Sequence, residues 1–166
     1  YETVKNIFKR AKISDDIFSD LTFFTKYKII GDDRPDTVSE EVYGTPDLDW
    51  VILMSNNIID IKNEWPMTQY DLNTYLNEKY TQEQLVDIHH YETTTFRDEK
   101  GRLIVPAGQV VDEDWSLEYF DGTHLRNTDG ILAGRPVRSV SFFEYEIKKN
   151  DAKRNINILK LSLIHI

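Results

Sequence analysis

Short apolar runs separated by turn residues predict a compact folding unit between residues 27 and 66. Extended apolar runs open and close this unit, and two segments with helix start and stop signals lie between them. The predicted order is strand, helix, helix, strand, at residues 27–30, 36–43, 48–54 and 58–61.

The two helices are predicted mainly from the residues at their ends. Pro35 and Pro46 stand where first turns begin, and the missing N–H of proline costs nothing there. Gly44 and Asn57 suit the left-handed residue that follows a helix. The segment 48–54 is apolar on almost every side, so a buried strand is the alternative to a buried helix.

Residues 1–26 carry apolar side chains at helical spacing, with basic side chains on the other face. The apolar positions are Val4, Ile7, Phe8 and Ala11. This pattern predicts an amphipathic N-terminal helical arm. Such an arm either packs on its own domain or docks on a neighbouring subunit, and the sequence leaves both open.

The remaining part, residues 67–166, is predicted to be an α+β extension that packs on the central unit or on partner subunits. A helix at 69–79 follows from apolar side chains at i, i+3, i+4 and i+8, with Thr68 as its cap. The β-rich run 86–96 predicts a hairpin with residues 103–105, because a glycine-containing turn separates them.

A second hairpin is predicted near the C-terminal end. Residues 143–148 alternate apolar and charged side chains, as a half-buried strand does, and residues 156–158 alternate again. A helix is the competing interpretation of the first run, because Ser141 and Glu144 have the spacing of a capping box.

Composition limits the classes of partner. The net charge of −9 argues against nucleic acid or an anionic membrane as the main partner and allows basic protein surfaces. The chain has no cysteine, which excludes disulfides and thiolate metal sites. No apolar run reaches the length of a membrane span.

Residues that could carry chemistry are few and do not form a known motif. His89 and His90 are adjacent, and we expect their side chains to point to opposite faces of a strand and not to share a metal ion. The acidic pairs and triplet at 32–33, 40–41 and 112–114 lack the oxygen-ligand spacing of a calcium loop. We therefore expect no catalytic residue, no metal site and no cofactor, and a protein that is not an enzyme.

The central unit resembles the LysM module, a βααβ fold, through Gly31-Asp32, two short helices, and Asn56-Asn57 followed by isoleucines. A longer pattern resembles the baseplate wedge protein 53 family of contractile-tailed bacteriophages, whose members carry a LysM-like domain. It comprises Gly-Asp-x-Arg-Pro-Asp at 31–36, Val-Tyr-Gly at 42–44, the run at 49–60 and Glu-Trp-Pro-Met at 64–67, with flanking pieces at 4–10, 89–92 and 153–156.

This resemblance implies a LysM-like module at 27–66 and a non-enzymatic structural subunit of the tail baseplate wedge, present in six copies. It implies assembly in the host bacterial cytoplasm and a place in the virion tail. The implied role is to brace neighbouring wedge proteins, namely the inner ring-forming subunit and the lysozyme-like wedge subunit.

Aromatic side chains are the expected interface anchors, because aromatics dominate protein interfaces. The candidates are Phe8, Phe23, Phe24, Trp115, Tyr119 and Phe120. All of them are equally compatible with a private core. Trp50 and Trp65 are assigned to the core of the central unit.

Glycan binding is the alternative function. LysM modules commonly bind N-acetylglucosamine polymers, such as peptidoglycan or chitin, between two loops. The matching loop residues here are Gly31, Asp32, Asp33, Arg34, Asn56, Asn57 and Ile58. Against this alternative, the chain lacks LysM repeats joined by linkers rich in Ser, Thr and Pro.

Overall fold

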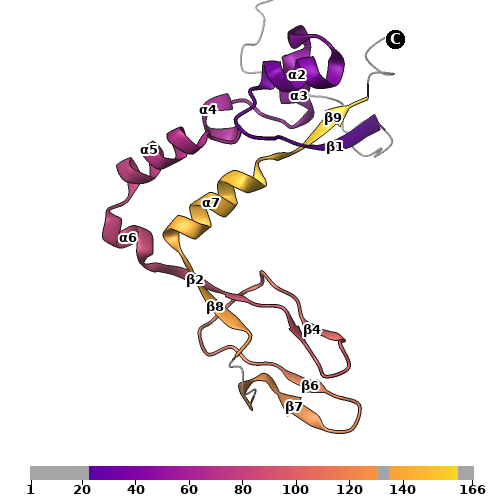
Figure 1. Ribbon diagram of the computed structural model, residues 1–166, viewed down its shortest axis with the longest axis vertical. Helices are drawn as coiled ribbons and strands as arrows, with labels where there is room; N and C mark the ends of the chain where they lie inside the picture. The colour runs from indigo at the N-terminus through magenta and orange to yellow at the C-terminus, as the bar shows by residue number, and fades with distance from the viewer. Residues whose placement is uncertain (1–22, 131–134, 161–166) are drawn as a thin grey trace, which may run out of the picture. The chain divides into compact units, whose positions relative to one another are not determined.

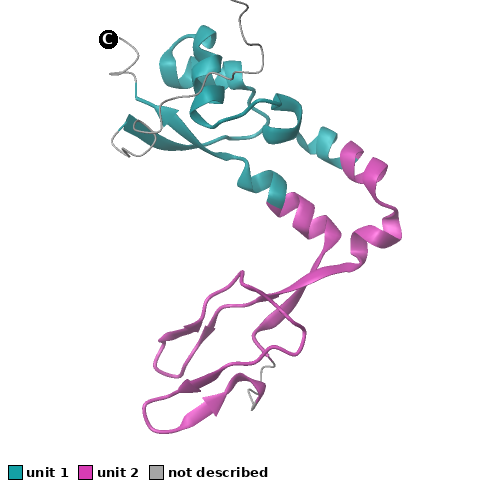
Figure 2. Ribbon diagram, turned by 180° about the vertical axis from the view of Figure 1, so that it is seen from behind, with its two compact units in different colours: residues 1–73, 149–166 teal, residues 74–148 magenta. Residues whose placement is uncertain are grey.

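The chain is an α+β protein, as the sequence predicted (Figure 1). The computed structural model describes residues 23–130 and 135–160. Contacts divide the chain into two compact units (Figure 2): unit 1 is residues 1–73 with 149–166, and unit 2 is residues 74–148. Both crossings of the chain between the units lie inside helices, α5 (Gln69–Lys79) and α7 (Phe142–Ala152).

Unit 1 is built on a two-stranded antiparallel ribbon that joins distant parts of the sequence. Strand β1 (Phe24–Lys28) pairs with β9 (Asn155–Leu159), in a register that sets Tyr27 opposite Ile156. Two helices, α2 (Pro35–Tyr43) and α3 (Asp49–Ser55), follow β1 along the chain.

The strand predicted at 58–61 is wrong. This stretch ends in a short helix, α4 (Ile61–Glu64), because two side chains cap its first turn. The Asp60 carboxylate accepts from the Lys62 N–H at 3.1 Å, and the Glu64 carboxylate accepts from the Ile59 and Asp60 N–H groups. The partner of β1 is β9, whose Ile156 and Ile158 side chains are buried on one face of the ribbon.

The two central helices form as predicted, with the expected residues at their ends. Helix α2 starts at Pro35 and ends at Tyr43, and Gly44 follows it with a left-handed φ of 75°. A 3₁₀ turn at Pro46–Leu48 leads into α3, and Thr45 caps this turn by accepting from the Asp47 N–H. Asn57 follows α3 with φ of 59°.

The core of unit 1 lies between the ribbon and these helices. Its buried side chains are Ile29, Val38, Tyr43, Val51, Ile52, Trp65, Ile156 and Ile158. Trp65 is in the core as expected, and its Nε1 donates to the Asp33 carbonyl at 2.9 Å. The assignment of Trp50 to the core is wrong: its side chain is 55% exposed. Val51, Ile52 and Ser55 face inward, which turns Trp50 to the opposite side of α3.

Unit 2 contains one three-stranded sheet and two hairpins. After the predicted helix α5 and a short helix α6 (Gln82–Val86), the chain enters the sheet, in which β2 is central. The strands are β5 (Val110–Val111), β2 (Ile88–Thr93) and β8 (Val137–Ser141), all antiparallel to their neighbours. The hairpins are β3 (Phe96–Arg97) with β4 (Leu103–Val105), and β6 (Glu118–Phe120) with β7 (Leu125–Asn127).

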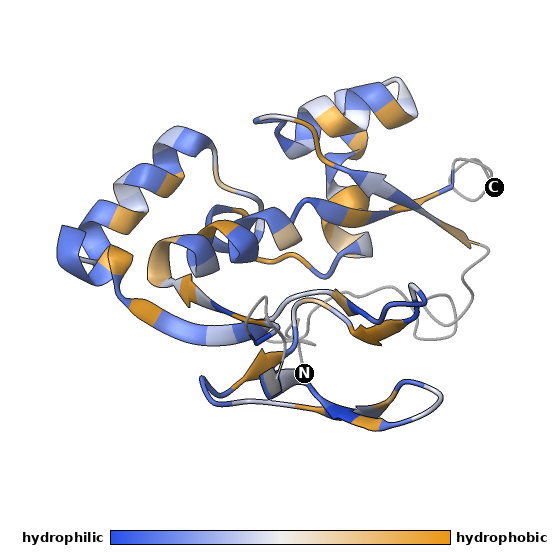
Figure 3. Cartoon of the chain, turned by 60° about the horizontal axis from the view of Figure 1, so that its bottom comes forward, coloured by the Kyte–Doolittle hydropathy of each residue, from blue (hydrophilic) through white to orange (hydrophobic). Residues whose placement is uncertain are grey.

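The first predicted hairpin forms only next to its turn, as β3 with β4, because most of the predicted first strand is β2, which pairs with β5 and β8. The second predicted hairpin is wrong. Residues 143–148 belong to helix α7, and the competing helical interpretation was correct: the Ser141 hydroxyl accepts from the Glu144 N–H at 3.2 Å. A strand with this alternation would expose Glu146 to solvent. In the helix Glu146 and Asn150 are both buried, four residues apart on one face, where each finds polar partners. Figure 3 shows the mixed hydropathy of the helices and strands.

Candidate interaction surfaces

The two hairpins of unit 2 are joined to each other, and we call them together the hairpin tip (residues 96–105 and 118–127). The ring of Tyr119 packs edge-on against Phe96, with centroids 5.6 Å apart. Across the same junction, Lys100 Nζ donates to the Asp121 carbonyl at 3.1 Å and Arg102 Nη2 to the Phe120 carbonyl at 3.4 Å. These contacts make the tip a single structural element.

The turn between β6 and β7 is held by Asp121. Its carboxylate accepts from the N–H groups of His124 and Thr123, both at 2.7 Å, and from Arg126 Nε at 2.6 Å. These bonds, with that of His124 the largest cause, hold the pKa of Asp121 well below its usual range. The turn is therefore a fixed charged structure.

A hollow of about 270 Å³ lies within the tip, beside the Asp121 turn. Two of the carboxylates that line it are paired inside the chain, Asp98 with Arg102 at 2.6 Å and Asp121 with Arg126 at 2.6 Å. We interpret this hollow as part of the tip's own structure.

The outer surface of the tip carries an exposed apolar pair. Phe120 and Leu125 lie directly opposite each other in the β6–β7 register, and their side chains are 59% and 68% exposed. Cross-strand neighbours at this spacing form one continuous apolar surface. The sequence analysis selected Phe120 but missed Leu125, although the Asp121-Gly122 turn between them indicates their pairing.

Unit 2 buries few of its large apolar side chains. Among its described residues the buried hydrophobic ones are Leu76, Leu85, Val105 and Val140. The exposed large hydrophobic ones are Val86, Ile88, Leu103, Val110, Leu117, Phe120, Leu125 and Phe143. A surface richer in large apolar groups than the interior beneath it is typical of a protein that binds others.

Buried charges in unit 2 are satisfied by partners within the unit. Glu146 is 4% exposed, and its carboxylate accepts from Lys79 Nζ at 2.7 Å and from the Tyr80 hydroxyl at 2.9 Å. The hydrogen bond with Glu146 is the main cause that raises the pKa of Lys79. No local pattern in the sequence indicates this group, because Glu146 in α7 and Lys79 at the end of α5 are 67 residues apart.

A second group surrounds Glu92 on strand β2. Its carboxylate, in a residue 8% exposed, accepts from Lys148 Nζ at 2.5 Å and lies 3.2 Å from His90 Nε2 and 3.4 Å from Arg138 Nη2. The bond from Lys148 is the largest cause that lowers the pKa of Glu92. This carboxylate fixes β2 against β8 and α7.

The two adjacent histidines lie on the same side of β2, so the expected opposite orientation is wrong. The register of β2 against β8 shifts between Ile88 and His90, which brings the two Nδ1 atoms to 2.7 Å. His89 also stacks on Tyr145, with centroids 4.0 Å apart. Over residues 23–130 and 135–160, no group of three or more His, Asp or Glu is placed to hold a metal ion.

The predicted interface anchors differ in how far their side chains are buried. Phe8 lies outside the described residues. Phe23 and Phe24 are half-buried at the start of β1, and Trp115 is half-buried in unit 2.

In the part of the chain that the structure describes, no helix is long and apolar enough to cross a membrane.

The candidate glycan loops are bonded to other parts of unit 1. The Arg154 guanidinium donates to the Gly31 carbonyl, and the Asp33 carbonyl accepts from Trp65 Nε1. The amide of Asn56 is bonded to the backbone of Asn157. The remaining loop residues, Asp32, Arg34, Asn57 and Ile58, are exposed or half-buried, and none of the seven lines the hollow in the hairpin tip.

A family model described as base plate wedge protein 53 matches residues 2–165, which is nearly the whole chain. The chain belongs to the base plate wedge protein 53 family. It is therefore a structural protein of the bacteriophage tail baseplate, as the sequence resemblance indicated. A search of curated proteins finds no match. The LysM-like arrangement itself is not confirmed, and the strand that closes the helical pair comes from β9.

Proposed function

We propose that this wedge protein braces its neighbours in the baseplate during tail assembly in the host cytoplasm, mainly by burying the exposed apolar side chains of the hairpin tip against them. The proposed partners are the inner ring-forming subunit and the lysozyme-like wedge subunit. No chemical step is needed, and we propose that the protein is not an enzyme.

The exposed pair Phe120 and Leu125 is the observation that carries this proposal. Burying two large apolar side chains on association gains about 25 cal/mol per Å² of apolar surface removed from water. The pair sits on a tip whose turn and strands are already fixed, so little conformational freedom is lost on binding. Phe23, Phe24 and Trp115, half-buried in the isolated chain, are proposed as secondary anchors.

The test compares the wild-type protein with a variant that carries Phe120→Ser and Leu125→Ser. Each is co-expressed with the other wedge proteins of the same phage, and the complexes are sized by gel filtration with multi-angle light scattering. We expect the wild-type chain to co-elute with the wedge proteins and the double variant to elute alone.

Val86→Ser is the matched control, because Val86 is 76% exposed in the same unit and lies on α6, away from the tip in the sequence. Circular dichroism and thermal melting should give the same values for all three proteins. A tip variant that still co-elutes, or a wild-type chain that joins no wedge complex, would contradict the proposal.

A further inference from the structure

The exposed indole of Trp50 stands on a strongly acidic surface of unit 1. Tryptophan is usually highly buried, yet 55% of this side chain is exposed on α3. Residues 31–57, which contain α2 and α3, include seven Asp or Glu and only one Lys or Arg, namely Arg34. This segment therefore combines an exposed aromatic ring with net negative charge.

Helix geometry places a second apolar group beside the indole. Met54 is half-buried and follows Trp50 by four residues, so the two are neighbours on one side of α3. Exposed Asp47 lies in the 3₁₀ turn that leads into the helix, and Asp49 is the first residue of α3. An acidic stretch of chain therefore leads directly into the exposed aromatic ring.

The acidic side chains next to Trp50 have no cationic partner among the described residues. Across residues 23–130 and 135–160, neither Asp47 nor Asp49 forms an ion pair. The Asp47 carboxylate accepts from the Thr45 hydroxyl at 3.5 Å, and the Asp49 carboxylate accepts from the Trp50 N–H at 2.6 Å. In this part of the chain no basic side chain neutralises either carboxylate.

We propose that this face, Asp47, Asp49 and Trp50, docks on a neighbouring wedge protein through an Arg or Lys side chain of that protein. The cation lies over the indole face, where the ring's negative charge density attracts it. The two carboxylates pair with it at the rim and favour encounter with a basic surface. The proposal rests on the proposed bracing function and assigns a second contact, in unit 1, distinct from the hairpin tip.

Binding is measured with the other wedge proteins of the same phage, purified together as a complex that lacks this chain. We expect Trp50→Ala to weaken the binding of the full-length chain at least tenfold, as truncation of a central aromatic anchor does. Asp47→Asn should weaken binding about threefold at low salt and not at high salt, where charges at an interface rim are screened.

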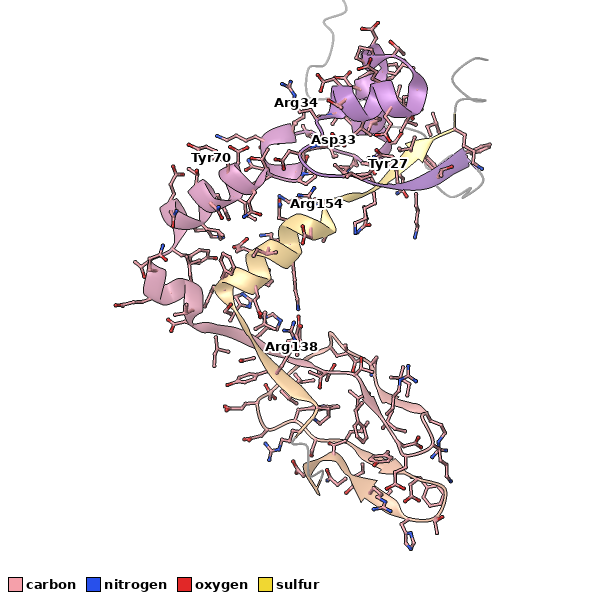
Figure 4. All side chains as sticks on the ribbon, viewed as in Figure 1. Tyr27, Asp33, Arg34, Tyr70, Arg138 and Arg154 are labelled. Atoms are coloured by element: carbon pink, nitrogen blue, oxygen red, sulfur yellow. The ribbon has the colours of Figure 1, made fainter. Side chains whose placement is uncertain are left out.

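Tyr70→Ala is the matched control, because Tyr70 is an exposed aromatic residue of the same unit, on α5, 79% exposed (Figure 4). It should bind as the wild type does. Equal binding by Trp50→Ala and the wild type, or an equal loss from both aromatic variants, would overturn the proposal. In either case wild-type binding still supports the bracing function, whereas failure of the wild type to bind overturns both.

A photo-crosslinker identifies the occupant directly. With p-benzoylphenylalanine in place of Trp50, irradiation of the assembled wedge should yield cross-links to a peptide of another wedge protein that contains Arg or Lys. Cross-links to a second copy of this chain, to peptides without a basic residue, or to none would overturn the proposal.

Discussion

The side-chain amide of Asn56 is hydrogen-bonded twice to the backbone of Asn157, 101 residues further along the chain. Its Nδ2 donates to the Asn157 carbonyl at 2.8 Å, and its Oδ1 accepts from the Asn157 N–H at 2.7 Å. The amide thus occupies the outer edge of β9 as the peptide group of another strand would. It fixes the end of α3 to the strand that closes unit 1.

We predict that Asn56→Ala lowers the free energy of unfolding by about 1–3 kcal/mol, because the N–H and the carbonyl of Asn157 in β9 both lose their partner. Asn56→Asp should have an intermediate effect, since it keeps the acceptor and loses the donor. Urea denaturation measures both.

Asn157→Ser is the control for this pair. The bonds use only the backbone of Asn157, and its exposed side chain makes no hydrogen bond in the described part of the chain. The control should stay within about 0.5 kcal/mol of the wild type. A loss as large as that of Asn56→Ala would mean that the amide pair is not the cause.

A second prediction concerns the buried carboxylate of Glu146. Glu146→Ala should destabilise the protein by about 1.5–3 kcal/mol, the range for hydrogen bonds to charged groups, because Lys79 and Tyr80 both lose their acceptor. Glu144→Ala, on the same helix but exposed, is the comparison. If the two variants melt at the same temperature, the buried group does not hold α7 in place.

Much of the fold followed from local signals in the sequence. Pro35, Gly44 and Pro46 marked the ends of the central helices correctly, because caps and breakers act on neighbouring residues. The helix at 69–79 followed from its periodicity in the same way. The helix α7 was the weaker of two interpretations, although its cap at Ser141 was visible.

The errors came from relationships between distant residues. The partner of β1 is β9, more than a hundred residues later, and no local pattern distinguishes it from the nearer run at 58–61. Trp50 was assigned inward because its segment is apolar all round, and only the packing of Val51 and Ile52 decides which side faces out. The candidate surface on α3 was missed for the same reason.

The third prediction concerns alkaline pH. Burial is the main cause that raises the pKa of Tyr43 from 10.0 to about 12. Its hydroxyl donates to the Leu159 carbonyl at 2.9 Å. Above pH 10 the unfolded chain releases this proton and the folded chain keeps it, so stability falls between pH 10 and about 12. The expected loss is on the order of 2 kcal/mol.

Denaturation of the wild type and of Tyr43→Phe at pH 9, 10 and 11 tests this sign. The variant should start about 1 kcal/mol less stable, because it lacks the hydrogen bond to Leu159, and then lose less stability with rising pH. Tyr27 also has a pKa raised to about 12, so Tyr27→Phe separates its share. Identical slopes for the wild type and Tyr43→Phe would refute the assignment to Tyr43.

The last prediction concerns acid. The bond from Lys148, supported by His90, lowers the pKa of Glu92 from its ordinary value of 4.5. Above pH 4.5 the carboxylate is ionised in both states, and its contribution to stability is complete. Below that pH the unfolded chain takes up the proton first, so the stabilisation falls as pH falls toward the lower pKa of the folded chain.

We therefore expect Glu92→Gln to be less stable than the wild type at pH 7 and the difference to shrink at pH 3, as measured by urea denaturation at both pH values. Glu78→Gln removes one exposed carboxylate of unit 2 that forms no ion pair over residues 23–130 and 135–160. This control should match the wild type at pH 7. Glu92 joins β2 to α7 through Lys148. A stability gap of the same size at pH 7 and pH 3 would contradict the prediction, because it would show that the charge of Glu92 does not hold these elements together.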